Sequence, residues 1–293
     1  MYISSRFATN RAARLAGNGV DPMTDEQIRA ISPSVFATTP HESRSTRFAH
    51  IPTFEVLAGM RREGFVPVKV SQNKSRIEGK SEFTKHMIRF RHLSHAGRGS
   101  LVLNQTFPEV VLINAHDGTS AYHLFKGMFR LACLNGMVVA SPGQDDELHI
   151  PHKGDVVGKV IEGSFEVIDE SQRAIAAAEA WTGMTLSRDE QSVMAEAAHM
   201  IRFGDAEGNI STPIQPEQML RSNRTADSGN DLWRTFNRVQ ENAIRGGLTA
   251  MGTDANGQHR RSTSRAINGI DQDVKINRAL WMIAERMAAL KAA

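Results

Sequence analysis

Apolar and polar residues alternate along the first half of the chain in a way that predicts a small β-sheet. Residues 65–72 (FVPVKVSQ) and 83–92 (FTKHMIRFRH) alternate with the period of two that half-buried strands show. Residues 107–115 (FPEVVLINA) form an almost continuous apolar run, which is typical of a central strand. A short polar connection joins the first two segments, so we expect an antiparallel meander of three strands.

We expect helices before and after this meander. Thr24 caps a predicted helix with the sequence TDEQIRAI, and Thr53 caps FEVLAGMRREG. Leu124 and Met128 belong to an apolar stripe with helical spacing, which predicts a helix over 120–134 that packs on the sheet. A short strand, MVVA, should follow it.

The second half of the chain has mostly helical spacing. Helices are expected over residues 155–181, 187–203, 230–246 and 271–290. Residues 247–266 (GLTAMGTDANGQHRRSTSRA) are polar and predict a loop. The predicted fold class is therefore α+β: a helix, then an antiparallel three-stranded β-meander packed on a helix, with a mostly helical C-terminal half.

These elements divide the chain into five expected segments. They are a flexible N-terminal arm (1–22), an α+β core with a basic sheet face (23–150), a helical region (151–246), a basic polar loop (247–270) and a C-terminal helix (271–293).

Composition narrows the class of protein. The 293 residues are 40% hydrophobic and 23% charged, which excludes collagen, coiled-coil rods and wholly disordered chains. A single cysteine, Cys133, excludes an internal disulfide and a cysteine-rich zinc site. No run of about 18 apolar residues and no apolar signal region is visible, so we expect a cytoplasmic protein that does not enter a membrane.

Charge is distributed very unevenly along the chain, although the net charge is only +3. Residues 41–100 hold twelve basic and five acidic residues, whereas residues 101–220 hold seven basic and seventeen acidic residues. Such a partition favours either a surface that binds a polyanion or the pairing of basic with acidic segments.

The strand over 83–92 carries the main candidate binding site. Its alternation places Lys85, Arg89 and Arg91 on one face, and Ile88 with Phe90 on the other. A row of exposed cations can bind backbone phosphates. The remaining candidate DNA-binding residues are Lys69, Lys74, Arg76 and Lys80 near the hairpin, Lys126 and Arg130 on the expected helix, and Arg260, Arg261 and Arg265 in the polar loop. We expect replacement of Arg89 and Arg91 by alanine to weaken DNA binding and leave the fold intact.

Catalytic chemistry is not expected. The pairs His116-Asp117, His92-x-x-His95 and His149-x-x-His152 each lack companion ligands at a suitable spacing for a metal site. The chain has no GxxxxGK[ST] phosphate loop and no GxSxG nucleophile elbow. We therefore expect no enzyme activity, no cofactor and no metal.

Three long segments resemble a known family. They are PSVFATTPHESRSTRFAHIPTFEVLAGMRREGFVPVKVSQNKSRIEGKSEFTKHMIRFRH, FPEVVLINAHDGTSAYHLFKGMFRLACLNGMVV and GIDQDVKINRALWMIAERM. Together they resemble family 932 of the domains of unknown function, which is carried by phages and plasmids and supplies no established catalytic residues. The resemblance implies an accessory protein of a prophage or a conjugative plasmid.

A weaker similarity concerns only the order of the elements. A helix, a basic β-meander and a following helix are similar to the core of the single-strand annealing proteins of the Redβ/RecT group. Our leading hypothesis is a homo-oligomeric ring or filament that binds single-stranded DNA and anneals complementary strands without ATP. The alternative is an anti-defence or regulatory protein that acts on a host protein through the acidic middle of the chain, and a nuclease is a distant third.

Overall fold

The computed structural model describes residues 21–41, 51–75, 77, 79–95, 106–130, 135–140, 147–253 and 257–292. Two compact units divide the chain. The first unit consists of Met1–Val139 with Gln144–Ile175, and the second consists of Ala140–Gly143 with Ala176–Ala293.

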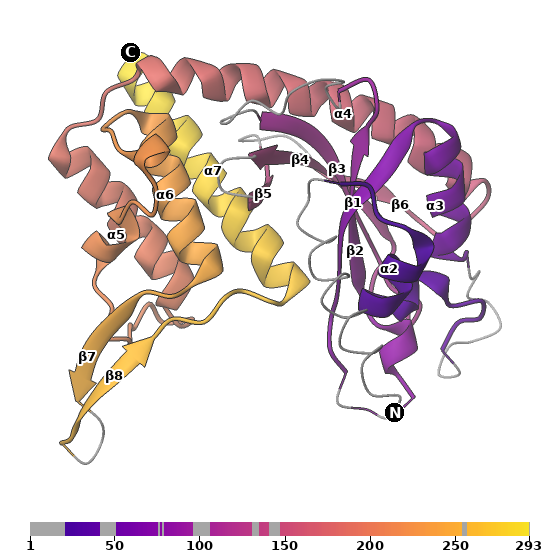
Figure 1. Ribbon diagram of the computed structural model, residues 1–293, viewed down its shortest axis with the longest axis horizontal. Helices are drawn as coiled ribbons and strands as arrows, with labels where there is room; N and C mark the ends of the chain where they lie inside the picture. The colour runs from indigo at the N-terminus through magenta and orange to yellow at the C-terminus, as the bar shows by residue number, and fades with distance from the viewer. Residues whose placement is uncertain are drawn as a thin grey trace, which may run out of the picture. The chain divides into compact units, whose positions relative to one another are not determined.

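An antiparallel six-stranded sheet forms the centre of the first unit (Figure 1). Five strands lie in the order β1-β2-β3-β4-β5, and β6 also pairs with β4. The strands are β1 (Phe65–Gln72), β2 (His86–His92), β3 (Thr106–Asn114), β4 (Tyr122–Arg130), β5 (Asn135–Val138) and β6 (Glu147–Ile150). The predicted meander is confirmed, since β1, β2 and β3 are neighbours in chain order.

One face of this sheet packs against helices. The helices of the unit are α2 (Asp25–Ile31), α3 (Thr53–Arg62) and α4 (Val156–Ala180), with short 3-10 turns η1 (Pro33–Phe36) and η2 (Ser81–Phe83). Ile88, Phe90 and Leu112 of the sheet share a fully buried core with Leu57 of α3 and Val160 of α4. Burial of apolar surface on this face is the main source of stability in the unit.

The prediction of a helix over 120–134 is wrong, because residues 122–130 form β4; residues 131–134 lie outside the described residues. Leu124 and Met128 point to one face of the sheet, and Phe125 and Phe129 point to the other. Since both faces are buried, apolar residues occur on each face, and Leu124, Met128 and their apolar neighbours can also be matched to helical spacing.

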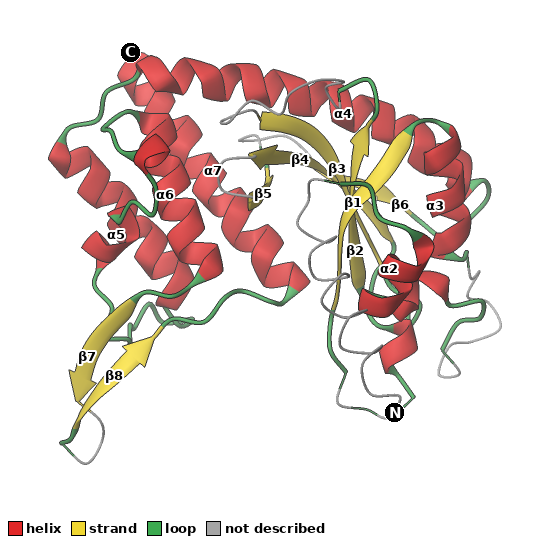
Figure 2. Cartoon of the chain, viewed as in Figure 1, coloured by secondary structure: helices red, strands yellow, loops and turns green. Residues whose placement is uncertain are grey.

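The second unit is mainly helical (Figure 2). Its elements are α5 (Arg188–Phe203), α6 (Leu232–Arg245) and α7 (Ile270–Ala292), the turns η3 (Trp181–Gly183), η4 (Pro216–Leu220) and η5 (Thr225–Asp227), and a hairpin of β7 (Thr249–Thr253) and β8 (His259–Thr263). An aromatic cluster forms part of its core, with the ring centroids of Trp181 and Trp281 4.6 Å apart.

The prediction of a loop over 247–266 is wrong, because β7 and β8 form an antiparallel pair in which Thr249 lies opposite Thr263 and Thr253 lies opposite His259. β8 is largely exposed and β7 is half-buried to exposed, so neither strand has the apolar alternation by which a strand is recognised in a sequence. None of the described helices is long and apolar enough to cross a membrane.

Candidate functional site

The predicted basic sheet face is not a solvent-exposed surface. Arg89 and Arg91 are only 2% and 3% exposed, and Lys126 and Arg130 are also buried. Alternation shows which residues share a face, but not whether that face meets water. The expectation of an exposed row of cations on β2 is therefore wrong.

A buried carboxylate neutralises the two arginines of β2. Arg89 Nε donates to Glu109 Oε2 at 2.6 Å, and an Arg91 guanidinium nitrogen donates to Glu109 Oε1 at 2.7 Å. The Arg91 guanidinium also lies over the rings of Phe107 and Phe129, at 4.5 and 4.9 Å from their centroids. These guanidinium groups interact with groups inside the protein, so they do not form part of a DNA-binding surface.

Two glycines make room for the Arg89 side chain. A Cβ atom at Gly136 would lie 2.5 Å from Arg89 Cζ, and one at Gly127 would lie 3.1 Å from a guanidinium nitrogen. In this space the guanidinium donates to the carbonyl oxygens of Met128 (3.1 Å) and Met137 (2.8 Å). The guanidinium thus joins β2 to β3, β4 and β5.

Two of the predicted lysines form ion pairs within the first unit. Lys126 lies 3.6 Å from Glu170 of α4, and Lys80 lies 3.2 Å from Asp117. Burial of Asp117 opposes its charged form, but hydrogen bonds from Thr119 and Lys80 outweigh that effect and lower its pKa. Asp117 therefore serves as an ionised anchor for the turn after β3.

The other predicted cations differ in exposure. Lys74 is exposed, Lys69 and Lys85 are half-buried, and Arg76 lies outside the described residues. Arg260, Arg261 and Arg265 are all exposed. The exposed arginines of the second unit thus fit the predicted role better than the arginines of β2.

A buried polar network that the sequence patterns did not reveal is centred on the Thr53 hydroxyl, at the first residue of α3. Four polar atoms surround Thr53 Oγ1: His86 Nε2 at 3.0 Å, His116 Nε2 at 3.1 Å, the Tyr122 hydroxyl at 3.2 Å and Asn114 Nδ2 at 3.0 Å. All five residues are 0% exposed. They come from α3, β2, β3, the turn after β3, and β4, so the network assembles only when the unit folds.

The hydrogen-bond partners assign the proton positions around His86. The Ser34 hydroxyl donates to Gln72 Oε1 at 2.8 Å, so Ser34 Oγ accepts from His86 Nδ1 at 2.9 Å. Burial lowers the pKa of His86 to about 4, so the ring is neutral and its Nε2 accepts the hydroxyl hydrogen of Thr53.

The remaining polar groups complete this arrangement. Thr53 Oγ1 then accepts from Asn114 and His116, while the Tyr122 hydroxyl donates to the carbonyl oxygen of Ile51 at 3.0 Å. Burial raises the pKa of Tyr122, which keeps its hydroxyl protonated. These hydrogen bonds tie α3 to the sheet, and the network continues through Asn114 Oδ1, which lies 3.0 Å from His152 Nε2. Among the described residues, no group of three or more His, Cys, Asp or Glu side chains is placed to hold a metal ion.

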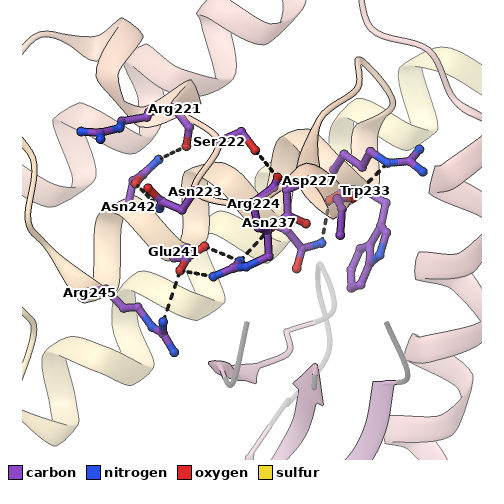
Figure 3. A network of polar contacts seen from close by, with 12 residues as sticks. Arg221, Ser222, Asn223, Arg224, Asp227, Trp233, Asn237, Glu241, Asn242 and Arg245 are labelled. Atoms are coloured by element: carbon purple, nitrogen blue, oxygen red, sulfur yellow. Dashed lines mark hydrogen bonds and ion pairs between the residues drawn. The ribbon is translucent and has the colours of Figure 1, made fainter. Parts of the chain in front are cut away.

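A second polar network fixes the segment before α6 in the second unit (Figure 3). Arg224 donates to both carboxylate oxygens of Glu241 at 2.6 Å and to Asp227 at 2.8 Å. Glu241 and Asp227 are buried, and their hydrogen bonds raise the pKa of Arg224. These charges stabilise the loop and are not available to a ligand.

The β7–β8 hairpin extends beyond the helices of its own unit and presents two different faces (Figure 1). On one face, a Cβ atom at Gly252 would lie 2.9 Å from Pro213 Cγ, so this face packs against the 213 segment. Met251 and Arg261 are direct cross-strand partners on the opposite face. Met251 is 63% exposed, and His259 and Arg261 are exposed beside it.

Comparison with known proteins adds a family and two relatives. A family model described as "Domain of unknown function (DUF932)" matches residues 40–281. The proteins UPF0380 protein YafZ and UPF0380 protein YfjQ of Escherichia coli (strain K12) are each 42% identical over 266 residues, which cover 91% of this chain and 92% of each relative. No solved structure matches the chain.

Proposed function

The chain belongs to the DUF932 family, and we propose that it binds single-stranded DNA through the exposed face of the β7–β8 hairpin. The observation that carries the proposal is the cross-strand pair of Met251 and Arg261, on the face opposite the one that packs against Pro213. This pair places an apolar side chain directly beside a positive charge on the exposed face, which suits a ligand that is both apolar and anionic.

Single-stranded DNA presents phosphates and unstacked bases together. Arg261 supplies a fixed positive charge for a phosphate, and the thioether of Met251 supplies a polarizable surface for a base. Arg260 on the other face and Arg265 after β8 add positive charge to the same segment. The hairpin therefore offers both kinds of interaction within a few residues.

We further propose that this binding serves a phage or plasmid, and that a ring or filament of subunits anneals complementary strands. Annealing requires no nucleotide hydrolysis, because a repeated phosphate-binding surface is enough to hold a strand extended. The element order that suggested the Redβ/RecT group is altered, since β4 replaces the helix expected after the meander. Annealing therefore rests on the chemistry of the hairpin and on the proposed subunit repetition.

The proposal is tested by measuring the affinity for single- and double-stranded oligonucleotides over a salt series. The double variant Arg260→Ala, Arg261→Ala should bind single strands more weakly, with a log–log salt slope smaller by roughly 0.7 for each phosphate that the protein no longer neutralises. Met251→Ala should weaken single-strand binding with little change in the slope. Arg188→Ala, which removes an exposed arginine of α5, is the matched control.

Two results would contradict the proposal. If the double variant and the Arg188→Ala control bind alike, the hairpin is not the site, and action on a host protein becomes the better hypothesis. If duplex DNA binds more tightly than the single strand and Met251→Ala has no effect, the hairpin instead acts as a β-ribbon that contacts a duplex groove.

A further inference from the structure

The first unit contains a cleft of about 370 Å³ between α2, η1 and α3 that differs from both polar networks. Asp25 and Arg29 of α2, Phe36 of η1, and Phe54, Ala58 and Arg61 of α3 contribute to its walls. Its volume lies at the lower end of the range for small-molecule sites. The cleft brings together two aromatic rings and two guanidinium groups.

The two arginines of the cleft have different roles. Arg61 donates to Asp25 Oδ1 at 2.5 Å and to the carbonyl oxygen of Met23 at 3.0 Å, so it is held as part of the wall. The Arg29 guanidinium lies 3.9 Å from the centroid of the Phe36 ring. Among the described residues Arg29 forms no ion pair, although Glu26 is near enough for the two charges to interact. With Asp25 paired to Arg61, the remaining charge of the lining is positive.

We propose that this cleft binds a nucleoside monophosphate group, with the phosphate on Arg29 and the base against the apolar wall. The guanidinium of Arg29 lies over the Phe36 ring, and its planar fork of N–H groups suits bidentate binding of a phosphate. Phe54 and Ala58 supply the apolar surface against which a flat base packs. The site lies in the first unit and is separate from the hairpin, so it extends the function proposed above and does not depend on it.

The nucleotide can come from two sources, a free nucleotide or the phosphorylated end of a DNA strand. Titration calorimetry on the full chain with dAMP, deoxyadenosine and inorganic phosphate tests the chemistry. A short oligonucleotide with a 5′-phosphate, compared with the same oligonucleotide ending in a 5′-hydroxyl, distinguishes the sources. To keep the hairpin from masking the result, the oligonucleotides are titrated against the Arg260→Ala, Arg261→Ala background.

We expect dAMP to bind more tightly than deoxyadenosine or phosphate alone, since neither fragment fills both parts of the cleft. Arg29→Ala should weaken dAMP binding by about 10- to 100-fold, as the removal of charge-assisted hydrogen bonds does. Arg29→Lys should restore only part of the affinity, because a lysine cannot form the planar fork. Ala58→Leu should also weaken binding by filling the cleft.

Arg62→Ala is the matched control, because Arg62 is an exposed arginine of α3 that does not line the cleft. Circular dichroism shows whether each variant is folded, so a failure to fold is separated from a loss of the site. The proposal is overturned if dAMP binds no better than phosphate, or if Arg29→Ala and Arg62→Ala bind dAMP equally well. Failure of the hairpin to bind DNA would leave this result unaffected.

Discussion

Replacing Arg89 by alanine should destabilise the first unit strongly, although the sequence alone suggested a harmless surface change. The substitution leaves the Glu109 carboxylate, whose side chain is 1% exposed, with Arg91 as its remaining ion-pair partner. It also removes the donor to the carbonyl oxygens of Met128 and Met137. Breaking a buried ion pair by removing one partner costs about 3–5 kcal/mol, out of a typical stability of about 5–15 kcal/mol.

Urea unfolding followed by two probes measures this effect. All three tryptophans of the chain (Trp181, Trp233 and Trp281) lie in the second unit, so their fluorescence reports on that unit. Far-UV circular dichroism reports on both units. We expect Arg89→Ala to move the circular dichroism transition to a lower urea concentration, which corresponds to a decrease of about 3–5 kcal/mol in the free energy of unfolding.

Two further variants test the reasoning. Arg62→Ala, an exposed arginine in the same unit, should change the free energy of unfolding by less than about 0.5 kcal/mol. Replacing Arg89 and Arg91 by methionine and Glu109 by leucine together should cost less than Arg89→Ala alone, because all three buried charges of this group are then removed. If Arg89→Ala unfolds at the same urea concentration as the unaltered protein, the buried ion pair does not stabilise the sheet and the reasoning is wrong.

Three other outcomes are expected. The pKa of His86 is lowered from 6.5 to about 4 in the folded protein, so its contribution to stability is complete above pH 6.5 and is lost as the pH falls toward 4, by up to about 3 kcal/mol. Urea midpoints at pH 7, 5.5 and 4.5 should show this decrease, and His86→Gln should remove the part of the pH dependence that His86 causes. Arg224→Ala should destabilise the second unit by about 2–4 kcal/mol, since Glu241 and Asp227 are left buried, and the shift should be seen in tryptophan fluorescence. Light scattering with and without single-stranded DNA should give a mass above that of a 32.3 kDa monomer, and a monomer under both conditions contradicts annealing by a ring or filament.

Elements that depend on local signals could be predicted from the sequence. The strand over 65–72 is confirmed at both ends, and Thr24 caps α2 with a complete capping box, as its position in the sequence predicts. These elements follow from short-range patterns, because strand alternation and cap hydrogen bonds involve residues close in sequence.

Features that depend on distant residues could not be predicted in this way. β4 lacks alternation because both its faces are buried, and the role of Arg89 depends on a carboxylate twenty residues away. The Thr53 network joins residues as far as 71 positions apart. The sequence signal that could have indicated it is His86, a polar residue on the same strand face as Ile88 and Phe90, since a buried polar group requires partners.

The glycine at position 136 has a consequence for the way in which the edge of the sheet is assembled. β5 is only four residues long, and so short a strand could pair with β4 in more than one alignment. Sliding β5 by two residues, the smallest shift that preserves its faces, would in one direction bring Val138 into the position of Gly136 and place its side chain against the Arg89 guanidinium. The guanidinium therefore excludes this shifted alignment by steric overlap, so that a charged side chain helps to select the strand pairing by its shape.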